Sequence, residues 1–441
     1  MSKIYAFLTT ILPILATLGA LQIALLFLDV NKRRQINFFI FGVLAFASIR
    51  PNILGETFGI IGPVYFFILF RISKSISPES IPDRVIIAKA RNALFFTISI
   101  LSVYWLYVSV ISSANGYPYS AWPPVANLGT VGLDCYLIFR IFKFGAATRL
   151  LKVFVIFVTY QAIAALISRY IFNYQFCLNF DAGRGWNYSI CAPGAVFQNS
   201  TRLTGFAGEP SIFATYLCIA IVSAWWPQFK FRIISAIIIS GTCAWASIIS
   251  NSTTGITLVF LALALILFQR FKIDNGPGLL VLYGLTVYYL VNTELIKSAL
   301  DKVLTNKKES NLGSITDRNL NLSFSDYLTR WETHPFGDLW GFRGSSYSGT
   351  INLLAESMMY GPAVILFMLV LIYGVVFLSD HRIRTLSALL IIFTTCLFLQ
   401  PTWLNAIWIV LIYLVTVVNL KQNSGLIGLE RQIAGESYKN I

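Results

Sequence analysis

The sequence predicts an all-α polytopic membrane protein with about 12 or 13 transmembrane helices. Of its 441 residues, 56% are hydrophobic and only 12% are charged, whereas a soluble globular domain carries about 25% charged residues. Many of the hydrophobic residues form uncharged runs of about 20 residues, the length that crosses the hydrocarbon core of a bilayer as a helix. No linker or repeat divides the sequence, so we expect residues 1–441 to form a single integral membrane domain.

The apolar runs and the polar segments between them define one consistent set of spans. The first run has no small-residue cleavage site before Lys32, so we expect a retained span rather than a signal peptide. The second and third runs are only about 15 residues long and could instead form one broken element around Pro51. The predicted spans are 5–28, 36–50, 57–71, 92–112, 125–142, 153–172, 206–226, 232–250, 254–269, 278–293, 350–378, 385–400 and 404–420.

The net charge of +14 comes from cations in short loops, a distribution that does not indicate a nucleic-acid partner. By the positive-inside rule these loops face the cytoplasm, together with the C-terminus, while the side of the N-terminus stays open. The loops between them then face outward, and two of these, at 173–204 and 293–350, hold most of the remaining polar residues. The basic loops contain Lys32, Arg33, Arg34, Arg71, Lys74, Arg84, Lys89, Arg91, Arg140, Lys143, Arg149, Lys152, Lys230, Arg232, Arg270, Lys272, Arg382 and Arg384.

The six cysteines are too scattered to define a metal site. Two of them, Cys177 and Cys191, share the first outward loop, where an oxidising compartment would permit a disulfide that closes a loop of about 15 residues. The alternative is two free thiols. The other four lie inside predicted spans, where a small apolar thiol packs well: Cys135, Cys218, Cys243 and Cys396.

The second outward loop, 293–350, is the longest polar segment and carries a balanced set of charges. Apolar residues at helical spacing predict a surface helix at 294–304, or a continuation of the preceding span, and a second short helix at 317–328. Its arginines Arg318, Arg330 and Arg343 are candidates to bind a pyrophosphate, because a guanidinium stays charged and donates paired hydrogen bonds. The alternative is that each arginine pairs with a neighbouring carboxylate.

His334 is one of only two histidines in the chain. It stands between Thr333 and Pro335 in a segment rich in glycine and aromatic residues, where a rigid turn could hold the imidazole near a substrate hydroxyl or phosphate. The alternative is an ordinary loop histidine. The other histidine, His381, lies in a basic turn on the predicted cytoplasmic side and is assigned no role.

Two further candidate groups stand at the entrances of predicted spans. Glu209 precedes Pro210, so it either caps a helix near the positive end of its dipole or faces the bundle as a functional carboxylate. Arg202 lies just upstream. Asn352 and Glu356 are four residues apart and therefore share one helix face. They either face an outward cavity or form hydrogen bonds to a neighbouring span.

Several common chemistries have no support in the sequence. There is no Walker A sequence, no Gly-x-Gly-x-x-Gly opening a helix, no His-Glu-x-x-His and no Cys-x-x-Cys. ATP hydrolysis, dinucleotide redox chemistry and zinc-dependent hydrolysis are therefore not predicted, and we expect neither a cofactor nor a metal. Chemistry on a substrate that already carries an activated leaving group fits better.

Three separated segments together resemble a known family. Residues 202–211, RLTGFAGEPS, look like the glutamate-proline-serine segment of bacterial Wzy-type O-antigen and capsular polysaccharide polymerases. Residues 330–341 resemble the arginine, ten residues, glycine pattern of the same family. The chain also resembles the wider superfamily that includes the WaaL O-antigen ligase, at Trp331, His334, Pro335, Gly337, Asn352 and Gly361.

The resemblance implies a glycosyltransferase of the GT-C type in the bacterial inner membrane, with the loops 173–204 and 293–350 and the active site on the periplasmic face. Its substrate would be an oligosaccharide linked to undecaprenyl pyrophosphate, and the enzyme would polymerise it by inverting, metal-independent transfer. Its partners would be the surrounding membrane lipids and, as a further candidate, a chain-length regulator. Arg202 and Arg330, with Arg318 or Arg343, would stabilise the pyrophosphate leaving group. Glu209 or His334 would accept the proton of the attacking hydroxyl, and Asn352 and Glu356 would support the site.

Two other functions stay open at this stage. The first is an O-antigen ligase, which uses the same donor and transfers the glycan to lipid A-core. The second is a flippase or other transporter of lipid-linked oligosaccharides, which predicts charged groups along a central path and symmetrical halves. The singled-out residues instead gather in outward segments, and the Glu209-Pro-Ser segment favours a polymerase over a ligase.

Overall fold

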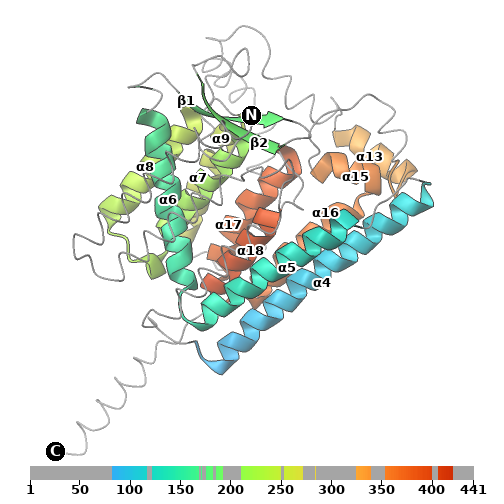
Figure 1. Cartoon of the computed structure of the whole chain (residues 1–441), viewed down its shortest axis with the longest axis horizontal. Helices are drawn as coiled ribbons and strands as arrows, with labels where there is room; N and C mark the ends of the chain where they lie inside the picture. Colours follow the sequence, from blue (N-terminus) through green and yellow to red (C-terminus); the bar gives the residue numbers. More distant parts are fainter. Residues whose placement is uncertain are drawn as a thin grey trace, which may run out of the picture.

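The structure is a computed structural model that describes residues 82–116, 122–167, 170, 175–181, 185–191, 210–249, 253–271, 284, 324–338, 353–399 and 406–420 (Figure 1). Within these ranges the chain is mostly helical, as predicted. The predicted spans at 5–28, 36–50 and 57–71, and all but residue 284 of the span at 278–293, lie outside the described residues. The predicted surface helix at 294–304 also lies outside them.

The described helices follow the predicted spans closely. Helix boundaries differ mainly where a helix continues past its apolar run into a polar end, as α4 does by starting at Arg84 rather than at residue 92. The helices are α4 Arg84–Ala114, α5 Trp122–Lys143, α6 Ala147–Ile167, α7 Pro210–Ala224, α8 Ile233–Ile249, α9 Thr253–Phe271, α13 Phe324–Thr333, α15 Leu353–Tyr360, α16 Ala363–Leu378, α17 Arg382–Thr394 and α18 Ala406–Val418, with short helical turns η3 Pro227–Phe229 and η4 Thr395–Leu399.

A two-stranded antiparallel hairpin, which was not predicted from the sequence, occupies part of the loop 173–204. Its strands are β1 Gln175–Asp181 and β2 Gly185–Cys191. The pairing runs from Gln175 opposite Cys191 to Asp181 opposite Gly185, so Cys177 lies opposite Ser189. The two cysteines are therefore diagonal neighbours rather than a directly opposed pair, and the disulfide stays a prediction.

The helix α7 lies at the centre of the bundle. Every residue from Phe213 to Ala224 is buried, and none is charged. The helices α6, α8, α9 and α17 all pack against it. It begins at Pro210, which confirms the predicted helix start, since proline fits the first turn where its missing N–H is not needed. A helix that is apolar on every side requires such complete enclosure.

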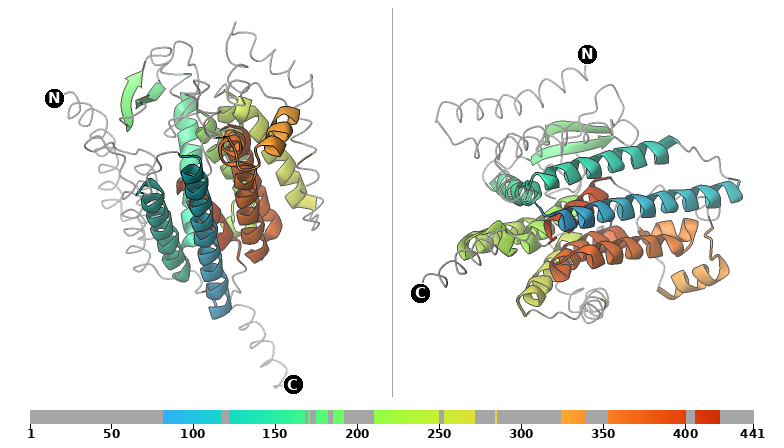
Figure 2. Two further views of the ribbon diagram at one scale, coloured as in Figure 1. Left: turned by 90° about the vertical axis from the view of Figure 1, so that its right-hand side faces the viewer. Right: turned by 90° about the horizontal axis from the view of Figure 1, so that it is seen from below.

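A second group of helices packs beside this centre. The helix α4 contacts α5, α16 and α18, and α18 also contacts α5 and α6. Figure 1 shows α4, α5 and α16 running along one another, and the two views of Figure 2 show the same arrangement. One continuous hydrophobic core joins both groups.

The outer faces of these helices are also apolar. On α8, Ile233, Ile234, Ile237 and Ile238 are each 55–71% exposed, and Tyr373 on α16 is 70% exposed. Contiguous apolar patches of this kind are rare on soluble monomers. Among the described helices, α4 and α6 have both the length and the apolar composition to cross a membrane, and five shorter ones are apolar as well.

Polar contacts tie several helix ends together at one end of the bundle. The amino group of Lys89 in α4 lies 2.5 Å from Asp380 Oδ1, between α16 and α17. Lys152 Nζ in α6 donates to the Phe229 carbonyl at 2.5 Å. The basic residues of the predicted cytoplasmic loops at 84–91, 140–152, 230–232 and 382–384 belong to these helix ends, and we refer to this part as the basic end. Two more bonds close the cluster, from Arg384 to Gln228 at 3.1 Å and from Gln228 to Asn419 at 3.0 Å.

At the opposite end, the predicted single span 350–378 is wrong in one respect, because it breaks into α15 and α16 at Gly361 and Pro362. Gly361 has a φ of +84°, which other residues rarely adopt, and Pro362 has no N–H to continue the ladder of α15. The Tyr107 hydroxyl, near the end of α4, donates to the Tyr360 carbonyl at 2.5 Å and fixes the break. The hairpin and α13 lie toward this same end (Figures 1 and 2).

Candidate active site at the α13–α15 pocket

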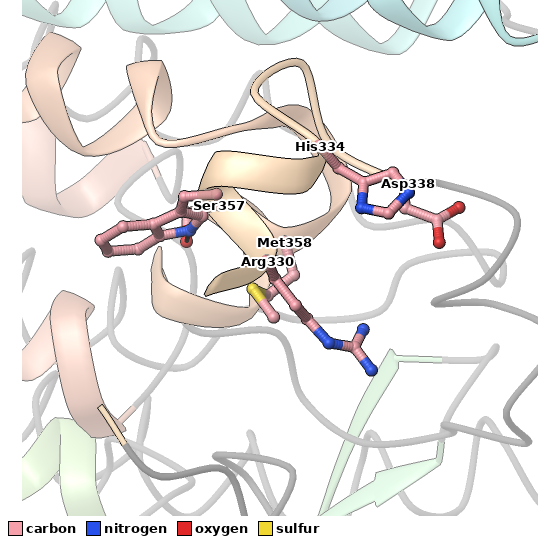
Figure 3. A pocket seen from close by; sticks show the side chains of 6 residues that line it. Arg330, His334, Asp338, Ser357 and Met358 are labelled. Carbon is pink, nitrogen blue, oxygen red and sulfur yellow. Dashed lines mark hydrogen bonds between the residues drawn. The ribbon is translucent and has the colours of Figure 1, made fainter. Parts of the chain in front are cut away.

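A pocket of about 360 Å³ lies between α13, the turn that follows it and α15 (Figure 3). Two of its lining residues, Arg330 and His334, were predicted to be functional from the sequence. The full lining is Arg330, Trp331, His334, Asp338, Ser357 and Met358. Three of these carry a cation, an imidazole and a carboxylate, so the pocket is suited to a polar or charged ligand.

The helix α13 supplies the first part of the pocket and corrects two predictions. It runs from Phe324 to Thr333, so it ends five residues beyond the predicted 317–328 helix, whose first part lies outside the described residues. Arg330 and Trp331 consequently stand on a helix and not in a loop. Arg330 occupies the last turn, where a cation interacts favourably with the negative end of the helix dipole.

Aromatic side chains dock α13 onto its neighbours. Tyr327 is only 3% exposed, and its ring centroid lies 6.2 Å from that of Trp331. The Trp331 indole N–H donates to Ser357 Oγ of α15 at 3.1 Å. Ser357 in turn donates to the Leu354 carbonyl at 2.6 Å, so its hydroxyl is oriented to accept the indole proton. This chain of bonds sets the distance between the two walls of the pocket.

The structure contains a turn at His334, where the sequence predicted one. The His334 N–H donates to the Arg330 carbonyl at 2.7 Å, and the Gly337 N–H donates to the His334 carbonyl at 2.9 Å. The Asp338 N–H then donates to the Met358 carbonyl of α15 at 2.9 Å. The turn is therefore anchored to α13 at one side and to α15 at the other.

Two glycines let this turn approach the break between α15 and α16. Gly337 has a φ of +83°, and a Cβ there would overlap the Met359 carbonyl. Gly361 has a φ of +84°, and a Cβ there would overlap the carbonyl of Pro335. Each glycine faces the main chain beside the other, so the two segments interlock through the backbone. Both positions require glycine for its conformation and for its lack of volume.

The polar groups of the pocket share one side of α13 and its turn. Arg330, His334 and Asp338 follow at intervals of four residues, and Figure 3 shows their polar ends directed away from Ser357. Arg330 and His334 are exposed to solvent, while Asp338 is partly covered. Within the described part of the chain, no carboxylate pairs with the Arg330 guanidinium. This finding does not support the alternative in which Arg330 is neutralised by a neighbouring acid.

Glu356 points away from this pocket, although Ser357 and Met358 beside it line the pocket. Its side chain is 2% exposed, and its Oε1 accepts a hydrogen bond from the Tyr104 hydroxyl of α4. Of the two alternatives stated for Glu356, the structure supports the helix-to-helix hydrogen bond over an outward cavity. Its second oxygen, Oε2, is buried and has no hydrogen-bond partner among the residues that the structure describes.

The other predicted site residues lie outside the described residues: Arg202, Glu209, Arg318, Arg343 and Asn352. Glu209 directly precedes the first residue of α7, as expected for a residue at that helix start. The structure thus brings together Arg330 and His334, and the roles of the remaining candidates stay predictions.

Three lining residues were not predicted from the sequence. Asp338 was counted only as one of several acids in a charge-balanced loop, although its spacing of four from His334 and eight from Arg330 is a usable signal. Ser357 and Met358 directly follow Glu356, and nothing in the sequence marked either of them as a lining residue.

No group of three or more His, Cys, Asp or Glu side chains in a metal-binding arrangement occurs among the described ranges. The donors that line the pocket, one imidazole and one carboxylate, are accompanied by a guanidinium, which is not a metal ligand. The arrangement can bind an anion through Arg330 and exchange a proton at His334 or Asp338.

The chain was also compared with known proteins by sequence and by structure. No protein-family model, no curated protein and no solved structure matches it.

Proposed function

We propose that this protein is a Wzy-type membrane glycosyltransferase that polymerises oligosaccharide repeat units linked to undecaprenyl pyrophosphate. The observation that carries the proposal is the placement of Arg330 and His334 in one pocket, at the end of the bundle opposite the basic end. A guanidinium beside an imidazole is the combination that a reaction with an anionic leaving group and a hydroxyl nucleophile needs.

The reaction joins two lipid-linked glycans. A hydroxyl oxygen of one glycan attacks the anomeric carbon of the other, the bond from that carbon to the pyrophosphate oxygen breaks, and the hydroxyl proton passes to a base. Direct displacement inverts the anomeric centre. Arg330 would hold the pyrophosphate as its charge develops, with Arg202, Arg318 or Arg343 as further cations. His334 is the base favoured by the pocket, and Glu209 is the other candidate.

The pocket has a suitable size for this chemistry. Its volume of about 360 Å³ lies within the range of about 300–1,000 Å³ that is usual for small-molecule sites. It can take a pyrophosphate and the sugar attached to it, while the lipid and the remaining glycan extend outside.

The apolar outer faces support a location in a lipid bilayer, in the inner membrane of a bacterium. Exposed isoleucines on α8 and aromatic residues on α16 face outward, where acyl chains would cover them at no cost. The basic end would then face the cytoplasm by the positive-inside rule, and the pocket would face the periplasm.

The decisive experiment is deletion of the gene and analysis of the surface glycan as a ladder on a gel. A polymerase predicts caps of a single repeat unit in the deletion strain. Unsubstituted lipid A-core with accumulated long lipid-linked chains would instead identify a ligase, and repeat units trapped on the cytoplasmic side would identify a flippase.

Purified protein in lipid vesicles gives an independent test. With lipid-linked repeat units as the substrate, we expect elongation in excess chelator, because the proposed charge stabilisation comes from arginines. Activity that disappears in chelator and returns with a divalent cation would contradict the arginine mechanism.

A further inference from the structure

The hydroxyl of Thr333 has one proton, and the backbone of α13 uses it. Thr333 Oγ1 donates to the Thr329 carbonyl at 2.9 Å, with the Arg330 carbonyl close by at 3.2 Å. A threonine near the end of a helix commonly bonds back to the carbonyl four residues earlier in this way. Only the lone pairs of Oγ1 are then left for another partner.

The His334 imidazole is that partner. Its Nδ1 lies 3.0 Å from Thr333 Oγ1. A hydrogen bond at this distance needs one proton between the two atoms, and since the hydroxyl proton is already directed to a carbonyl, the proton must belong to Nδ1. In a neutral imidazole with the proton on Nδ1, the other nitrogen, Nε2, carries an accessible lone pair.

We infer that Thr333 holds neutral His334 in the Nδ1–H tautomer and thereby makes Nε2 the proton acceptor of the pocket. Thr333 is a positioning residue, since it acts only through His334. The tautomer follows from the hydrogen bonds alone, whereas its use in proton transfer rests on the proposed function.

The surroundings of the imidazole are compatible with this role. The charged groups that line the pocket with it are Arg330 and Asp338, and Glu356 on the adjacent α15 faces Tyr104 instead. When Nε2 accepts the proton of the attacking hydroxyl, the imidazolium keeps its Nδ1–H bond to Thr333, and the Asp338 carboxylate in the same pocket favours the new charge. The proton therefore moves without a rotation of the ring.

The tautomer can be measured directly, because the chain has only two histidines. The variant His381→Gln, purified with isotope-labelled histidine and studied by NMR at pH about 9, where imidazoles are neutral, contains His334 as its single signal. We expect nitrogen and Cδ2 shifts of the Nδ1–H form. In the same background, Thr333→Ser should keep these shifts and Thr333→Val should lose them.

A control variant distinguishes the effect of removing the Thr333 hydroxyl from the effect of removing a similar threonine hydroxyl near another helix end. Thr416 in α18 donates to the Ile412 carbonyl at 2.7 Å, in the same manner but in a buried part of the bundle. Thr416→Val should leave the His334 shifts unchanged. A dominant Nε2–H form in the unsubstituted protein, or equal shifts in Thr333→Val and Thr333→Ser, would overturn the inference.

Activity tests the second half of the inference separately. In the vesicle assay, Thr333→Val should slow elongation by on the order of 10-fold at unchanged substrate affinity, and Thr333→Ser should restore most of the rate. An unaffected rate in Thr333→Val would show that the tautomer has no catalytic use. Complete absence of elongation by the unsubstituted protein would contradict the proposed function, while the NMR result would still decide the tautomer.

Discussion

A spacing of four residues places the side chains of Arg330, His334 and Asp338 in the same pocket. One helical turn separates Arg330 from His334, and the turn closed by the Gly337 N–H then returns Asp338 to the same side. Two of the three residues were predictable because their chemistry is conspicuous in an apolar chain. Asp338 was not predictable, because only the turn brings it to the same side as Arg330 and His334.

Arg330→Lys tests whether the guanidinium geometry matters. Lysine keeps the charge but cannot donate two parallel hydrogen bonds to one anion, so we expect a loss of elongation of about 10-fold or more. The matched control is Arg232→Lys, which changes an exposed arginine at the basic end and should have no effect. Equal rates of both variants at equal protein levels would remove Arg330 from the site.

Tyr104 and Glu356 form a buried pair whose partners are 252 residues apart in sequence. Tyr104→Phe should lower the stability of the purified protein by about 1–3 kcal/mol, because it leaves a second buried oxygen of Glu356 without a donor. Adding Glu356→Leu should recover part of this loss, since removing both partners removes the unmet polar group. The apparent melting temperature in one detergent measures both effects, and strictly additive losses would contradict the pairing.

At the scale of elements, the helices were largely predictable and their interruptions were not. The polar residues and prolines that bound each apolar run locate α5, α8 and α18 to within a few residues. The break between α15 and α16 was not predicted, because the residues on both sides of it are apolar and hydrophobic periodicity alone cannot separate two helices from one. The β1–β2 hairpin was not predicted, because its aromatic residues were interpreted as parts of a loop without secondary structure.

The partners of these elements could not be predicted either. The contact of α13 with α15 depends on Trp331 and Ser357, and the sequence does not say which serine accepts the indole proton. The same holds for the interlock of Gly337 and Gly361, since single-sequence reasoning identifies a glycine turn but not the main chain that approaches it.

Gly337→Ala and Gly361→Ala should displace the pocket turn from α15. Each change adds the strain of a positive φ, about 1–2 kcal/mol, to a collision with a backbone carbonyl that cannot move aside easily. Gly116→Ala is a matched control, because Gly116 has a φ of +65° but open space around its Cα. We expect a clearly lower melting temperature and lost elongation for the first two variants, and only a small decrease in melting temperature for the control. Equal behaviour of all three variants would mean that the close approach contributes nothing.

The whole molecule has two ends of different character, joined by apolar helices. The basic end collects cations from loops that are far apart in sequence, and the pocket end carries the single strongly amphipathic helix described, α13. The sequence predicted this division through the distribution of Lys and Arg, since that distribution is a property of the chain and not of its folding.

Opposite labelling of the two ends tests the proposed orientation. Single cysteines in place of Glu332 and Arg232, both exposed, are introduced into a cysteine-free background. In intact spheroplasts an impermeant maleimide should label the cysteine at position 332, and it should label the one at position 232 only after lysis. The reverse pattern would place the pocket in the cytoplasm and exclude a periplasmic active site.

The two interlocked glycines have a consequence for how the pocket can diversify. Its shape is set by main-chain contacts at Gly337 and Gly361, whereas its chemistry is set by the side chains of Arg330, His334 and Asp338. Shape and chemistry are thus encoded at different positions. Substitutions among the lining side chains can change what the pocket binds while its framework stays in place, which makes this region a practical starting point for engineering altered ligand preference.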